Sequence, residues 1–125
     1  FLYFEEASFN LAVAAAGWRI VVAPRARIWH AKRSSGRLPA PTYVYYFVRN
    51  RLQFAREHAP DWDGEVPPDL AEWIRAWRTK VERADPTWAD TYERLVSWAL
   101  DDGHAGVTGR RPDIEDVAAG GSHDG

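Results

Sequence analysis

The chain has 125 residues, enough for one domain with a buried core, and its net charge of −2 provides no positive field that would favour nucleic acid as a partner. The absence of cysteine excludes disulfides, thiolate catalysis and cysteine-ligated metal sites. No apolar stretch reaches the roughly 20 residues needed to cross a bilayer, and two glutamates near the start occupy the place of the basic region of a secretory signal.

The N-terminal region predicts the end of a strand followed by a helix. Aromatic and apolar side chains fill residues 1–4. Small and apolar residues then recur at helical spacing, which predicts a helix over 5–16 that Gly17 ends. Glu5 and Glu6 lie in the first turn of this helix, where the positive end of the helix dipole favours the ionised carboxylate.

Two short strands and a basic loop are predicted next. The β-branched run at 18–22 and the stretch at 26–29 have the composition of strands, and His30 follows the second one directly. We expect Trp18 to lie in the core. Residues 31–41 have the composition of a loop. Cations and hydroxyls gather near its start: Lys32, Arg33, Ser34 and Ser35.

The rest of the chain is predicted to be mainly helical. Apolar side chains at helical spacing predict helices over 42–58, 69–83 and 86 to about 102, with Gly103 as the last stop. Asp85 before a proline is typical of a helix N-cap followed by the first helical position. The tryptophans of these helices fall on apolar faces, so we expect them to pack in the core instead of stacking on sugars.

Several linked pieces of the sequence together resemble a known family. Phe-Leu-Tyr-Phe-Glu-Glu at 1–6, Gly-Trp-Arg-Ile at 17–20 and Pro-Arg-Ala-Arg-Ile-Trp-His at 24–30 occur in this order. The pattern resembles the C-terminal half of the catalytic domain of family 2 glycosyltransferases of the GT-A type. Arg49 and Asn50 resemble an Arg-Asn pair common after that half, and we assign them to packing.

The resemblance implies a fold class and a division of the chain. We expect an α/β fragment, with one helix and short strands from a GT-A domain, over residues 1–38. A mostly α-helical extension is expected over 39–111, and a disordered tail over 112–125 because little apolar surface remains there to bury. Since the chain opens on Phe1 within a strand-like run, we expect it to be part of a longer parent protein.

The activity implied by the resemblance is an inverting transfer of a sugar from a nucleotide-sugar donor to a hydroxyl of a cell-surface polysaccharide or glycolipid. Glu6 matches the general base of the family, which takes the proton of the acceptor hydroxyl, and Glu5 is a supporting carboxylate. Glu6 is one methylene longer than the usual Asp, so it reaches about 1 Å further. Ser8 and Ala12 also depart from the family pattern, which shows an acidic residue and an Arg there.

The resemblance also implies a divalent metal, Mn or Mg, held mostly by ligands in the N-terminal half of the parent protein. His30 matches a metal-binding histidine, and imidazole suits Mn²⁺. The donors of Lys32, Arg33, Ser34 and Ser35 would close over the diphosphate as a flap. From the residues alone, a structural hydrogen bond for His30 and a solvated turn for the loop are the simpler interpretations.

By the same resemblance, we expect the protein in the cytoplasm, at the inner face of the cell membrane, with peripheral membrane association. The chain alone is expected to be inactive because it lacks the nucleotide-binding units. The alternative is a non-catalytic α-helical interaction domain whose aromatic helix over 42–58 binds a partner or a membrane surface. A degenerate glycosyltransferase retained as a scaffold is a third interpretation.

Overall fold

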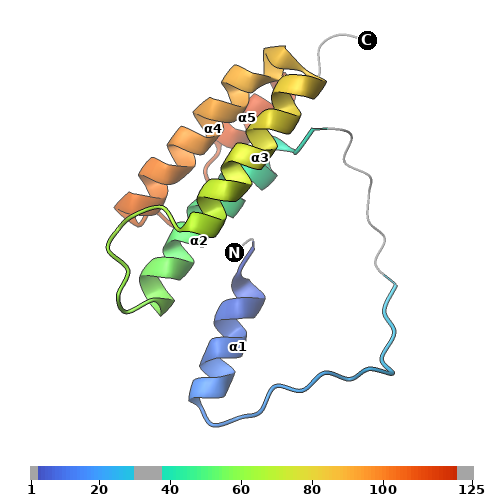
Figure 1. The fold of residues 1–125 in the computed structure, drawn as a ribbon, viewed down its shortest axis with the longest axis vertical. Helices are drawn as coiled ribbons and strands as arrows, with labels where there is room; N and C mark the ends of the chain where they lie inside the picture. The colour runs from blue at the N-terminus through green and yellow to red at the C-terminus, as the bar shows by residue number, and fades with distance from the viewer. Residues whose placement is uncertain (1–2, 30–37, 121–125) are drawn as a thin grey trace.

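The computed structural model describes residues 3–29 and 38–120, and this part of the chain is all α-helical (Figure 1). The helices in chain order are α1 (Glu5–Ala15), α2 (Pro41–His58), α3 (Pro68–Ala84), α4 (Pro86–Ala105) and α5 (Asp113–Gly120). No strand occurs among the described residues. The α/β fold class expected for the N-terminal region was therefore wrong, whereas all four predicted helices are present.

Residues 18–29, where two strands were predicted, form an extended and exposed segment (Figure 1). A strand must pair its backbone N–H and C=O groups with a neighbour, and the described residues offer none. A β-branched composition is therefore not sufficient by itself to form a strand here. Trp18, expected in the core, is 73% exposed. Tyr3 and Phe4, expected at a strand end, have φ of 69° and 67° and lead into α1.

The core lies between α2, α3 and α4, with α2 packed along α4 and α5 packed on α2. The buried side chains of α2 and α4 follow the helical period. They include Val44, Val48, Leu52, Tyr92, Leu95 and Ala99. Trp73, Trp77 and Trp88 are partly buried against this cluster, so their assignment to the core is confirmed.

The predicted start of α4 agrees with the structure, whereas its predicted end does not. Asp85 is the N-cap, as predicted, and its carboxylate accepts a hydrogen bond of 3.0 Å from the Thr87 N–H. The predicted stop at Gly103 was wrong, because α4 continues to Ala105 and Gly106 is the C-cap with a φ of 72°. Gly103 has a packing role instead: a Cβ at this position would lie 2.7 Å from Cδ1 of Leu52.

The chain after residue 112 differs from the expected disordered tail, because α5 forms there. Ile114 has no exposed surface, since it packs into the core beside α2. An 8-residue helix is too short to give a clear period in sequence, and this one depends on the contact of Ile114. Residues 121–125 lie outside the described part.

Helix α1 stands apart from the other helices and contributes no buried residue (Figure 1). The side chain of Phe4 anchors its start, with ring centroids 5.3 Å from Phe47 and 5.6 Å from Phe54. The Ser8 hydroxyl lies 3.1 Å from Nε2 of His58. No helix in the described part of the chain combines the length and apolar content needed to cross a bilayer.

Candidate functional site: a polar hollow at the start of α1

A cavity of about 390 Å³, here called the polar hollow, lies where the first turn of α1 meets α2 and the loop after α4. Its walls come from three segments that are distant in sequence. The polar side chains that line it are Glu5, Ser8, Arg49, Asn50, Gln53, Glu57 and Thr108. The aromatic rings of Tyr3, Phe4 and Phe54 form its apolar side.

The two predicted catalytic carboxylates are placed differently. Both lie in the first turn of α1 and both are exposed. Glu5 lines the polar hollow, whereas Glu6 is absent from its lining. Successive residues of an α-helix point about 100° apart, so the two side chains leave α1 in different directions. The proposed supporting carboxylate is thus on the hollow, and the proposed base is next to it.

Arg49 forms the floor of the polar hollow as a buried cation, with 2% of its surface exposed. Its Nε donates to the Asn50 Oδ1 at 2.9 Å, and its Nη1 donates to the Gly109 carbonyl at 2.8 Å. The guanidinium lies over the ring of Tyr46, 4.9 Å from the centroid. A buried charge is tolerated where its donors are bonded in this way. The sequence interpretation of Arg49 as packing polarity is confirmed by this burial, and the structure adds that Arg49 and Glu5 line the same hollow.

A hydrogen-bond network behind Arg49 holds the loop after α4 against α2. The Tyr45 hydroxyl donates to the Asp102 carboxylate, and Nη1 of Arg111 lies 2.7 Å from the same carboxylate. The backbone N–H of Arg111 donates to the Tyr46 hydroxyl at 3.0 Å. Burial raises the pKa of the Tyr45 hydroxyl, and its bond to Asp102 acts in the same direction. Tyr45 therefore stays neutral at physiological pH and serves as a donor.

The remaining predicted site residues lie outside the described part of the structure. These are His30, Lys32, Arg33, Ser34 and Ser35. Among the described residues there is no group of three or more His, Asp or Glu side chains arranged to hold a metal ion. No described residue is therefore assigned as a metal ligand, and the predicted diphosphate flap stays a prediction.

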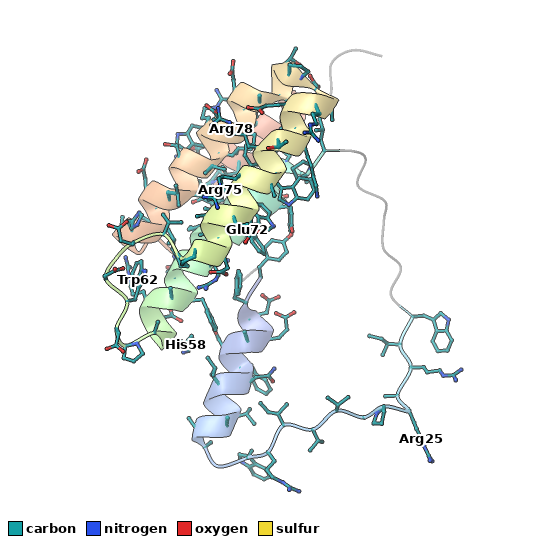
Figure 2. All side chains as sticks on the ribbon, viewed as in Figure 1. Arg25, His58, Trp62, Glu72, Arg75 and Arg78 are labelled. Carbon is teal, nitrogen blue, oxygen red and sulfur yellow. The ribbon has the colours of Figure 1, made fainter. Side chains whose placement is uncertain are left out.

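A second cavity, of about 600 Å³, lies between α1, the end of α2 and the loop before α3. Its lining is mainly apolar, with Leu11, Phe54, Trp62 and Val66 among its residues. His58 is also part of this lining, at the end of α2 that faces α1 (Figure 2). The sequence interpretation did not identify this cavity, because nothing in the local pattern relates Leu11 to the loop around Trp62.

Comparisons of the chain with protein-family models, with curated proteins and with solved structures found no match. The site is therefore interpreted from its geometry, and the resemblance to family 2 glycosyltransferases stays a prediction.

Proposed function

We propose that this chain is part of an inverting glycosyltransferase that moves a sugar from a nucleotide-sugar donor to a hydroxyl of a glycan or glycolipid. The observation that carries the proposal is the position of the carboxylate-bearing first turn of α1 at the edge of the polar hollow. This arrangement gives an acceptor hydroxyl a place to bind beside a proton acceptor. The ordered sequence pattern around Glu6 and His30 supports the same activity.

In the proposed reaction, the Glu6 carboxylate takes the proton of the acceptor hydroxyl while the hydroxyl oxygen attacks the anomeric carbon of the donor. The bond between that carbon and the nucleotide diphosphate breaks on the opposite face, so the configuration inverts. Glu5 accepts a hydrogen bond from the acceptor and orients it. General base catalysis of this kind contributes about 10²–10⁴-fold in rate. By the resemblance alone, the reaction takes place at the inner face of the cell membrane.

The test uses the complete protein as its gene encodes it. Transfer of labelled sugar from UDP-glucose, UDP-galactose, GDP-mannose and dTDP-rhamnose to lipid and glycan extracts of the host would be measured. We expect Glu6→Gln to lower kcat by about 10²–10⁴-fold, because an amide cannot accept the proton. Glu72→Gln is the matched control, since Glu72 is exposed on α3 (Figure 2). Equal rates for Glu6→Gln and the wild type would remove Glu6 as the base, and no transfer from any donor would reject the function.

A second candidate function is a non-catalytic interaction module, and the exposure of residues 18–29 favours it. Ile28 and Trp29 are 90% and 88% exposed, and Val22 in the same segment is 88% exposed. Several exposed apolar side chains in one segment are typical of a binding surface. This candidate becomes the better one if the complete protein transfers no sugar.

A further inference from the structure

We propose that the polar hollow binds a single neutral pyranose, the terminal sugar of the acceptor. This inference rests on the proposed function and names the class of molecule that the carboxylate-bearing turn would act on. The volume of about 390 Å³ lies near the lower end of the roughly 300–1,000 Å³ typical of small-molecule sites. One sugar ring fits within such a volume, whereas an extended oligosaccharide would project beyond the hollow.

The lining offers both chemistries that a pyranose presents. The ring hydroxyls donate to carboxylate and amide oxygens and accept from amide N–H groups. Glu5 supplies a carboxylate from α1, and α2 supplies the Glu57 carboxylate and the Gln53 amide, whose Nε2 also donates to the Val107 carbonyl. The apolar C–H face of the ring matches the rings of Phe4 and Phe54, whose centroids lie 5.6 Å apart at an interplanar angle of 32°. A site with few polar groups against an aromatic wall is the usual design of a small-ligand pocket.

The charges of the hollow select against an acidic sugar. Glu5 and Glu57 place two carboxylates on its lining. Arg49 is the cation of the lining, but it donates to protein acceptors at Asn50 and Gly109. His58 Nε2 lies 3.8 Å from the Glu57 carboxylate and adds a positive charge only when protonated. A uronate or phosphate would therefore add a negative charge to a lining that already carries two carboxylates, which costs binding free energy.

Thr108 provides a way to fill the hollow without touching the core. It is exposed in the loop after α4 and lines the hollow. Thr108→Trp would place an indole ring where the sugar is proposed to bind. Thr79→Trp is the matched control, because Thr79 is an exposed residue of α3 away from this lining. Thermal unfolding of both variants verifies that the fold is retained.

The experiment is saturation-transfer NMR on the 125-residue chain with the methyl glycosides of glucose, galactose, mannose and glucuronic acid. We expect at least one neutral glycoside to receive saturation, and Thr108→Trp to weaken its binding about 10-fold or more while Thr79→Trp leaves it unchanged. Methyl glucuronide is expected to bind at least about 5-fold more weakly than the best neutral glycoside. The inference is overturned if Thr108→Trp leaves binding unchanged, if no neutral glycoside binds, or if the glucuronide binds equally well.

A second measurement separates this inference from the proposed function. In the complete protein, Thr108→Trp should raise the KM for the acceptor and leave the KM for the donor unchanged. If the chain binds a neutral glycoside in the hollow but the complete protein transfers no sugar, the hollow remains a sugar site and the proposed function is rejected. If sugar is transferred but Thr108→Trp leaves the acceptor KM unchanged, the inference about the hollow is rejected and the proposed function stands.

Discussion

Asp85 sets the start of α4 through bonds to one neighbouring residue. Its Oδ1 accepts hydrogen bonds from the Thr87 hydroxyl at 2.6 Å and from the Thr87 N–H at 3.0 Å. These bonds, the hydroxyl foremost, stabilise the ionised carboxylate and hold the pKa of Asp85 below its ordinary value. The same contact that caps the helix therefore makes its stability dependent on pH.

The first prediction follows from the sign of this shift. A carboxyl group whose folded pKa is lowered stabilises the fold fully above its unfolded pKa, about 3.9, and loses this contribution as the pH falls through the folded pKa. Asp85→Asn keeps a good N-cap residue but does not titrate. In melting curves measured from about pH 6 to about pH 2, we expect any advantage of the wild type over Asp85→Asn to shrink below about pH 4. A difference in Tm that is constant with pH would contradict this.

Glu5 and Glu6 show what a sequence pattern can specify at the scale of a residue. The pattern places both in the first turn of a helix, and the structure has them there. Which of the two faces a wall depends on the rotation of α1 about its axis, and this is set by the packing of Phe4 on Phe47 and Phe54. That packing joins residues 43 and 50 positions apart in the chain, so no local sequence pattern indicates it.

At the scale of elements, the helices were predictable and the strands were not. The helical spacing of Val44, Val48 and Leu52 indicates a buried face within one segment. Asp85, followed by a proline, likewise indicates the N-cap of α4 from local sequence alone. The run at 18–22 indicates only that a strand would be favourable if a neighbouring strand were available for backbone pairing. The same limit applies to the polar hollow, whose walls at Gln53 and Thr108 come from separate helices and loops.

The second prediction concerns how α1 is held. An isolated helix of 11 residues is marginal in water, and α1 has no buried residue, so Phe4 should carry most of its docking. In Phe4→Ala we expect the amides of α1 to exchange with solvent markedly faster in hydrogen–deuterium exchange, with α2 and α4 unchanged.

Phe9→Ala is the matched control, because Phe9 lies in the same helix but is 68% exposed. It should leave exchange in α1 close to that of the wild type. If both variants accelerate exchange equally, helix propensity and not the docking of Phe4 holds α1. If neither does, α1 is stabilised by contacts other than those of Phe4.

At the scale of the whole molecule, the described chain has two parts that differ in burial. Every buried hydrophobic side chain of the described part lies between Val44 and Ile114. The network of Tyr45, Asp102 and Arg111 lies within the same part. The segment from 5 to 29 has no buried residue. The helical bundle therefore supplies the stability, and the N-terminal segment contributes one wall of the polar hollow.

The third prediction is that residues 38–120 fold without the preceding segment. We expect this shorter chain to remain helical by circular dichroism and to unfold cooperatively, with a Tm within about 5 °C of that of the 125-residue chain. It loses the half-buried contacts of Tyr3 and Phe4 and the contact of Ser8 with His58, but no buried residue. A chain of residues 38–112 is the control. It lacks Ile114, whose burial is complete, and should lose about 2–5 kcal/mol of unfolding free energy.

The outcome bears on the reaction as well as on stability. If the 38–120 chain is as stable as expected, α1, which carries Glu5, docks on a bundle that folds independently of it. The polar hollow then forms only when α1 is docked. Phe4→Ala should then weaken glycoside binding without lowering the Tm of the bundle, because docking of α1 and folding of the bundle are separate equilibria. If the shorter chain instead loses cooperative unfolding, the N-terminal segment is part of the folding unit, and this separation of roles is wrong.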